Sequence, residues 1–264
     1  MHRFAAAAIF LSIAGYAGAA SAADLPARSY TKAPVIAEPA YNWSGFYAGV
    51  VGGGAWGRSQ NYQDDPAASA AAVAAGRPAP FGLAQTSGIS PSGALVGGTV
   101  GYNYQFSNNV VIGIENDLSW TDLKGTANYV PPFRTTDTAQ TSQSWLDTLR
   151  GRLGFAWNRW LVYGTGGVAV TEEKFLICNV AVGCAGQSKT VAGWAAGGGV
   201  EYAFAGNLSA KLEYLHADFG TQSFTRTPIA NGFYAARNIT LTNDIVRVGV
   251  NYKFGWDGPL IAKY

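Results

Sequence analysis

The chain has 264 residues, of which 13% are charged and 13% aromatic, with 34 glycines and a formal net charge of +2. Charged residues make up about a quarter of an average soluble domain, so this chain is either an exported β protein or a barrel whose outer wall contacts lipid. The near-neutral charge gives no electrostatic case for a nucleic acid partner, and the length allows one large β domain or two small ones.

Residues 1–22 predict a secretory signal peptide. A short basic start (His2, Arg3) precedes an apolar run and the small-residue site Ala20-Ser21-Ala22. Residues 23–42 contain three prolines and no periodicity, which predicts an exposed periplasmic linker. No later segment offers 18 consecutive apolar residues, so we expect the exported chain to enter a membrane only as a closed barrel.

Alternating apolar and polar residues then predict eight strands, which together form a barrel over residues 43–254, followed by a tail over 255–264. Short and long connections alternate strictly. Outer-membrane barrels show this asymmetry, with short periplasmic turns and long extracellular loops. The predicted strands cover 44–56, 93–106, 110–120, 144–157, 160–170, 191–204, 208–218 and 239–254, and the long loops 57–92, 121–143, 171–190 and 219–238.

Charged residues in these strands share one parity, and large apolar residues take the other. Asp147 and Asp244 break the rule, both close to a predicted loop. Parity alone does not tell which wall faces inward, because a soluble lipocalin-like barrel has its apolar wall inside and a membrane barrel inverts it. The charged set is Glu115, Asp117, Arg150, Arg152, Glu201, Lys211, Glu213, Arg247 and Lys253.

Several features favour the membrane barrel, with the charged set as a paired network in the lumen. Small residues share the polar parity, and balanced charges suit a crowded interior. Aromatic residues gather at strand ends, as in the girdles at lipid interfaces. These interface aromatics are Phe106, Trp120, Trp145, Trp157, Trp160 and Phe204.

The last predicted strand contains "RVGVNYKF". Its Arg247, Gly249, Tyr252 and Phe254 resemble the insertion signal that the barrel-assembly machinery recognises on terminal strands of outer-membrane proteins. Ten residues follow the motif, whereas such a signal usually ends the protein. We therefore expect an all-β, eight-stranded, antiparallel up-and-down transmembrane barrel in the cell outer membrane.

Two cysteines, Cys178 and Cys184, lie close together in the predicted loop 171–190. In an exported protein such a pair predicts a small loop disulfide. A metal site is the weaker alternative, because no His, Asp or Glu lies between or close beside them.

Several stretches together resemble a known family: "YNWSGFYAGVVGGGAWG", "RGRLGFAWNRWLVYGTGGVAV", "GGGVEYAFAGNLSAKLEYLHADFG" and "VRVGVNYKFGW". They are similar to small outer-membrane surface proteins of alphaproteobacteria, the porin-family or OmpA-like β-barrel group that includes major surface antigens and a hemin-binding branch. The resemblance covers nearly the whole mature chain except the long loops. It implies an eight-stranded outer-membrane barrel and no defined chemical activity.

We therefore expect a structural surface protein with a plugged lumen, without catalytic residues, metal or cofactor. Its partners would be outer-membrane lipid and lipopolysaccharide, the barrel-assembly machinery, and a host or surface ligand held by the loops. One alternative is a narrow pore lined by the charged set. Another is hemin binding through His216 or the loop tyrosines Tyr62, Tyr129 and Tyr234. A third is a membrane-embedded enzyme that uses His216 with Asp218, although no serine motif accompanies them.

Overall fold

The computed structural model describes residues 41–64, 74, 88–128, 136, 138–179, 183–224 and 237–255. The predicted signal peptide, nearly all of the predicted linker and the tail after Gly255 lie outside the described residues. Contacts divide the chain into Met1–Pro39 and Ala40–Tyr264, and every strand belongs to the second unit.

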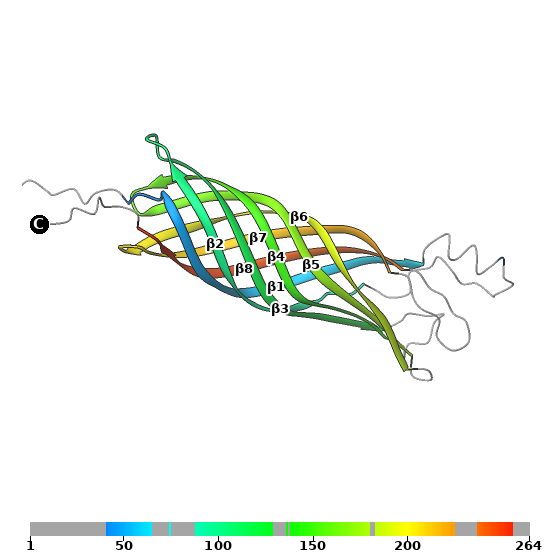
Figure 1. Ribbon diagram of the computed structural model, residues 1–264. Coiled ribbons are helices and arrows are strands. Elements are labelled where there is room, and N and C mark those ends of the chain that lie inside the picture. The colour runs from blue at the N-terminus through cyan, green and yellow to red at the C-terminus, as the bar shows by residue number, and fades with distance from the viewer. Residues whose placement is uncertain are drawn as a thin grey trace, which may run out of the picture. The chain divides into compact units, whose positions relative to one another are not determined.

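Eight antiparallel strands close into a barrel in which each strand pairs with its neighbours in sequence and β1 pairs with β8, as the sequence predicts (Figure 1). Among the described residues, no helix is long and apolar enough to cross a membrane. The strands are β1 (Gly45–Asp64), β2 (Ser92–Gln105), β3 (Val110–Asn128), β4 (Thr138–Trp157), β5 (Trp160–Asn179), β6 (Gly183–Ala205), β7 (Leu208–Phe224) and β8 (Arg237–Lys253).

Three short turns join β2 to β3, β4 to β5 and β6 to β7. Each has a residue with positive φ: Asn109 (66°), Asn158 (53°) and Gly206 (38°). Asn and Gly tolerate this conformation, which tight hairpins need. The short connections predicted between 106 and 110, between 157 and 160 and between 204 and 208 therefore rest on backbone geometry that Asn and Gly favour.

The strands run further toward the long-loop end than the sequence predicted. The prediction of a long loop over 171–190 is wrong, because β5 continues to Asn179 and β6 begins at Gly183. Cross-strand pairing is continuous from Trp160↔Tyr202 to Asn179↔Gly183. The segment was missed because its alternation carries polar residues on the wall that is apolar elsewhere.

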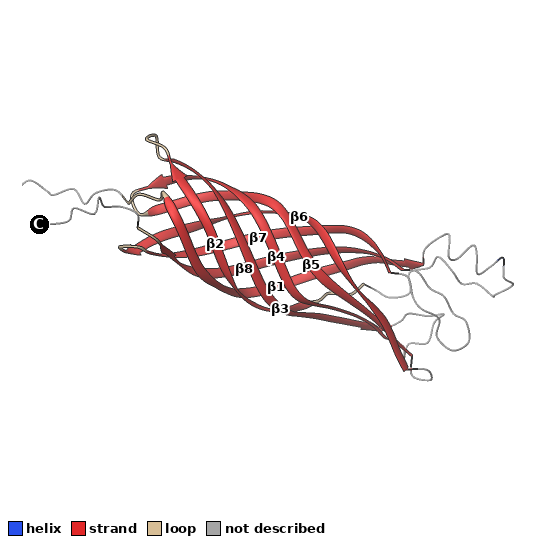
Figure 2. Ribbon diagram, viewed as in Figure 1, coloured by secondary structure: helices blue, strands red, loops and turns tan. Residues whose placement is uncertain are grey.

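The register sets a narrow, strongly tilted barrel. Following paired residues from strand to strand around the sheet, from Tyr47 on β1, leads back to β1 at Gly57, ten residues further along. Such a stagger tilts the strands by about 35–45°, and the crossing strands of Figure 2 show the tilt. An eight-stranded barrel leaves an interior that side chains can fill.

Exposed aromatic residues gather on the outer wall at two levels, which we call the aromatic bands. On β1, Phe46 (59% exposed) and Trp56 (45% exposed) lie ten residues apart, with Val50 (65% exposed) between them. Ten tilted residues at about 3.3 Å each span roughly 25 Å, the height of the apolar band of a transmembrane barrel. The band at the short-turn end includes Tyr104, Phe106, Phe155, Trp157, Trp160, Phe204, Tyr252 and Phe254, and the other includes Trp56, Trp120 and Trp194.

Beyond the second aromatic band the two walls exchange character. Inward side chains become apolar there, and they form a buried cluster that includes Leu123, Phe175, Phe219, Phe224 and Leu241. The outer wall at this level carries polar residues such as Lys124 and Lys174, both exposed. This part of the barrel is therefore built like a soluble protein, with an apolar core inside and polar residues outside.

Candidate functional site: the charged lumen

Two arginines at the centre of the lumen bind three carboxylates. Arg150 of β4 donates to Glu115 (2.8 Å), Asp117 (2.5 Å) and Glu213 (3.1 Å). Arg247 of β8 donates through Nη2 to Asp117 (3.0 Å) and through Nε to Glu213 (2.7 Å). Arg150–Glu115 and Arg247–Glu213 join neighbouring strands and follow the wall. Arg150–Glu213 and Arg247–Asp117 join strands that are not neighbours, so these two contacts cross the lumen.

A second group lies on the short-turn side of this centre. Arg152 pairs with Glu201, which also accepts hydrogen bonds from Ser209 (2.6 Å) and Asn251 (2.8 Å). Lys211 donates to Glu115 at 2.9 Å, and Arg152 Nη1 lies 4.0 Å from the same carboxylate, which links the two groups.

Four carboxylates and four cations thus meet in the lumen. None of the eight is more than 4% exposed. Equal numbers of opposite charges, each with hydrogen-bonding partners, are the condition under which buried charges are tolerated.

Two tyrosines complete the network, and the sequence prediction missed both. Tyr47 donates to Glu115 at 2.8 Å, and Tyr163 donates to Glu213 at 3.1 Å. The Arg152 guanidinium also lies 3.5 Å from the centre of the Tyr163 ring, a cation–π contact. Their signal in the sequence is parity, since Tyr47 shares the inward parity of Gly49 and Gly53, and Tyr163 that of Thr165 and Gly167.

Lys253 lies apart from this network, although it was predicted with the other eight. Its Nζ donates to the backbone carbonyl of Asn42 and lies 4.4 Å from the centre of the Tyr41 ring. The reason is position: Lys253 is the last residue of β8, at the short-turn end of the barrel.

A separate polar group lies inside the apolar cluster at the long-loop end. Asn243 donates to Gln143 at 2.7 Å, and Gln143 is the cross-strand partner of Glu173. Glu173 is 2% exposed, and its Oε2 has no hydrogen-bond partner among the described residues. Gln143 lies two residues beyond Trp145, so Glu173 stands outside the aromatic bands. Burial raises the pKa of Glu173 to about 8, against a smaller lowering effect of its hydrogen bond with Gln143.

His216 lies on the outer wall. Its Nδ1 is 2.8 Å from Asp244 Oδ1, which also accepts a hydrogen bond from Tyr214 (2.6 Å), and its ring contacts Trp194. Asp218, the partner weighed for an enzymatic pair, accepts instead from the Gly220 amide at 2.7 Å.

The loop tyrosines Tyr129 and Tyr234 and the side chain of Tyr62 lie outside the described residues. Within the described part of the chain, no three His, Cys, Asp or Glu side chains gather as a metal site would require.

The remaining predicted residues occupy the outer wall and the strand ends. Cys178 and Cys184 are directly paired across β5 and β6 and form a disulfide.

In the predicted insertion signal, Arg247 points into the lumen, whereas Tyr252 and Phe254 are exposed on the outer wall and their rings lie 5.3 Å apart. Gly249 faces Val51 and Lys211, where an added Cβ would be tightly packed.

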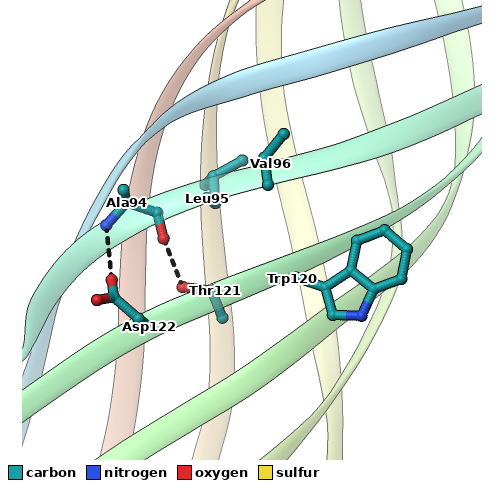
Figure 3. A pocket seen from close by; sticks show the side chains of 6 residues that line it. All are labelled: Ala94, Leu95, Val96, Trp120, Thr121 and Asp122. Carbon is teal, nitrogen blue, oxygen red and sulfur yellow. Dashed lines mark hydrogen bonds between the residues drawn. The ribbon is translucent and has the colours of Figure 1, made fainter.

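A hollow of about 360 Å³ lies between β2 and β3 at the second aromatic band (Figure 3). Val96 and Trp120 give it an apolar side, and Asp122 and Thr121 a polar one. Asp122 accepts from the Ala94 amide at 3.1 Å, and Thr121 donates to the Ala94 carbonyl at 3.2 Å. These polar groups are already bonded to backbone, so the hollow is a feature of the outer wall and not a reactive site.

Known outer-membrane proteins are similar to this chain in sequence. The 31 kDa outer-membrane immunogenic protein of Brucella melitensis biotype 1 is 34% identical over 258 residues, which cover 93% of this chain and 98% of that protein. The 25 kDa outer-membrane immunogenic protein of Brucella canis is 27% identical over 222 residues, 84% of each chain. The 22 kDa outer membrane protein of Rhizobium leguminosarum bv. viciae is 30% identical over 124 residues, 47% of this chain and 52% of that protein.

Among solved structures, the outer membrane protease OmpT from Escherichia coli covers 80% of this chain and 97% of its own, with a TM-score of 0.50 and 8% identity, a likeness of fold alone. The family model for the outer membrane protein beta-barrel domain matches residues 7–254. The predicted membrane location is thereby confirmed. The chain belongs to the outer membrane protein beta-barrel domain family, and it resides in the cell outer membrane.

Proposed function

We propose that the chain is a structural surface protein whose plugged barrel anchors extracellular strand ends and loops and contributes to envelope integrity. The observation that carries this proposal is the filled lumen. The eight-residue charge network closes its middle, and the apolar cluster with Phe175 and Phe224 fills its long-loop end. A solute crossing the barrel would have to separate buried ion pairs and displace packed apolar side chains, both of which cost several kcal/mol.

The same residues argue against the pore alternative. Pore-lining charges leave a hydrated path between them. Here Arg150 and Arg247 contact carboxylates from the opposite wall, so the side chains occupy the path. Conduction would require the network to rearrange.

The hemin alternative has weaker support. His216 is engaged with Asp244 on the outer wall beside Trp194, at the second aromatic band. A ligand there would lie against lipid and not among the loops.

The similar Brucella proteins support the surface role. Both are named as immunogenic outer-membrane proteins. Immune recognition of an outer-membrane barrel requires exposed extracellular segments. In this chain the strand extensions beyond the second aromatic band are the described segments suited to that role.

Surface display is tested by labelling lysines on intact cells with a membrane-impermeant amine reagent, followed by mass spectrometry. Lys174 and Lys189 are exposed at the long-loop end, whereas Lys253 lies at the short-turn end. We expect Lys174 and Lys189 to be labelled on intact cells and Lys253 only after the envelope is opened. The reverse pattern would refute the proposed orientation and with it the display function.

The envelope role is tested by deleting the gene and measuring growth in detergent. We expect increased sensitivity that the wild-type gene restores. A deletion strain that tolerates detergent as well as its parent does would refute the proposed contribution to envelope integrity.

A further inference from the structure

One strand of the barrel leaves part of its edge open. β6 pairs with β5 over its whole length, from Gly183 to Tyr202. Its pairing with β7 extends only from Ala205 to Trp194, the partner of Asp218. Among the described residues, no strand pairs with the other edge of β6 between Gly183 and Gly193.

The opening has a local cause in β7. A β-bulge between Asp218 and Gly220 shifts the register of β7 against β8, and Gly220 has a φ of 65°. The Asp218 carboxylate accepts the Gly220 amide at 2.7 Å and holds the bulge. Bulges bend a strand and end its pairing, so β7 continues beside β8 to Phe224 without β6.

The burial pattern agrees with an open edge. Most strand residues follow an inward and outward alternation in burial, but five consecutive residues of β6, from Gly186 to Thr190, are all exposed. A side-chain hydrogen bond from Lys189 Nζ to Gln222 Oε1, at 3.2 Å, crosses the opening.

The direction of the backbone groups follows from the pairing. The Ala203 amide donates to the Arg159 carbonyl at 2.9 Å, so this residue of β6 faces β5. Antiparallel strands alternate in this respect, and the β5–β6 register has no shift. Even-numbered residues of β6 therefore face away from β5. The amides and carbonyls of Gly186, Ser188 and Thr190 point into the opening.

The disulfide holds this edge in an extended form. Cys178 and Cys184 are cross-strand partners at the end of the β5–β6 hairpin, so their bond fixes the hairpin in the paired register. An edge that is already ordered loses little conformational entropy when another strand adds to it.

We propose that the edge of β6 from Gly183 to Ala192 binds an extended segment of an extracellular protein, which adds as a strand through backbone hydrogen bonds. Unpaired strand edges bind extended peptides in this way. A second copy of this chain fits less well. Copies inserted in one membrane have β6 running toward the periplasm in both, so their edges could pair only in parallel, which is the less stable arrangement per residue. The inference rests on the proposed surface orientation, because the edge must face outside the cell.

The test uses the full barrel in lipid nanodiscs and a phage-displayed library of linear peptides of about ten residues. Binders selected on the wild type are synthesised, and their Kd values are measured by fluorescence anisotropy. Ser188→Pro and Thr190→Pro each remove one amide that faces the opening and leave the β5 pairing intact, because proline is tolerated at strand edges. Ser188→Ala and Thr190→Ala are the matched controls, since they change the side chain and keep the amide. A heat-modifiable gel shift checks that each variant is folded.

We expect each proline variant to weaken binding by roughly tenfold, the value of one backbone hydrogen bond, and each alanine variant to stay within about twofold. A selected peptide N-methylated at alternate residues should lose binding as well. Binders that tolerate both proline variants, or no enrichment over empty nanodiscs, would overturn the proposal. A wild-type dimer in light scattering that the proline variants abolish would overturn it in favour of a second copy. None of these results depends on lysine labelling, so failure of the edge proposal is distinguishable from failure of the display function.

Discussion

Arg247 of β8 and Asp117 of β3, which are 130 residues apart in the sequence, meet inside the lumen, where Arg247 Nη2 donates to Asp117 Oδ2 at 3.0 Å. Neither residue is more than 2% exposed. β3 and β8 are not neighbours in the sheet, so the contact ties together walls that backbone hydrogen bonds do not join. The network is thus both the plug of the barrel and a set of cross-braces.

Removing one member of this network should destabilise the barrel strongly. Arg247→Leu leaves Asp117 and Glu213 buried without their main cation, and breaking a buried pair in this way costs about 3–5 kcal/mol. Urea unfolding in lipid vesicles, followed by tryptophan fluorescence, measures the free energy of unfolding. Lys174→Ala removes an exposed positive charge and should change it by less than about 0.5 kcal/mol. Equal losses in the two variants would show that the lumen charges are not specifically coupled.

Glycines on the inner wall should be less replaceable than those outside. A Cβ at Gly197 would overlap the Tyr214 carbonyl oxygen, whereas a Cβ at Gly164 on the outer wall would have its nearest neighbour at 3.8 Å. We expect Gly197→Ala to lower the free energy of unfolding by about 1–3 kcal/mol, the usual cost of overpacking. Gly164→Ala is the control, and a loss as large as that of Gly197→Ala would contradict the tight inner packing.

The free-energy cost of a cation on the outer wall depends on how deep its position lies in the bilayer. Val50 lies midway between Phe46 and Trp56 on β1, at the middle of the apolar band. Val50→Arg should cost about 2–4 kcal/mol at the bilayer midplane, whereas an interfacial or outer position costs about 0–1 kcal/mol. Thr126→Arg, at an exposed site of β3 beyond the second aromatic band, serves as that comparison. A Val50→Arg barrel as stable as the Thr126→Arg barrel would mean that this wall does not face lipid.

The raised pKa of Glu173 predicts how the free energy of unfolding depends on pH. Burial raises the pKa of Glu173 from 4.5 to about 8, so the folded barrel holds a proton that the unfolded chain releases. The stability from this group is complete below pH 4.5 and is lost as the pH rises through about 8. We expect the free energy of unfolding to fall across this window, by at most about 1.4 kcal/mol per pH unit.

The matched variants for this pH test lie side by side on β5. Glu173→Gln should abolish this component of the slope. Glu172→Gln removes a carboxylate from the outer wall and should retain it, because Glu173 is still present. A slope that survives Glu173→Gln would assign it to another group.

Strand number, order and closure could be predicted from the sequence, since a period of two and alternating connection lengths are properties of local segments. That Glu115, Arg150 and Glu213 share one wall likewise followed from parity, and the small residues on that parity, with the aromatic residues at strand ends, predicted that this wall faces inward. The parity of residues along a strand does not tell which side chains from opposite walls come into contact in the lumen. The meeting of Arg247 with Asp117 depends on the ten-residue stagger, which arises only when the sheet closes.

The outer ends of the strands were mispredicted for a different reason. Inside the bilayer, apolar residues mark the outer wall, but beyond it Phe175 and Leu241 are buried inside the barrel and polar residues face out. Bulges between Gln143 and Leu146 in β4 and between Asp218 and Gly220 in β7 also interrupt the period of two, so a rule fitted to the membrane segment ends each strand too early. The open edge of β6 could not be predicted from the sequence of β6 either, because it depends on a bulge in β7 at Gly220.

Ion conduction through the lumen tests the plugged barrel most directly. The measurement is single-channel recording in planar bilayers of refolded barrel that shows the heat-modifiable gel shift, with Arg150→Ala and Glu115→Ala recorded alongside the wild type. Discrete conductance should be absent from the wild type, because the charge network and the apolar cluster fill the path. Reproducible wild-type channels, weakened by changing Arg150 or Glu115, would contradict the plugged barrel and make the same charges a conduction path.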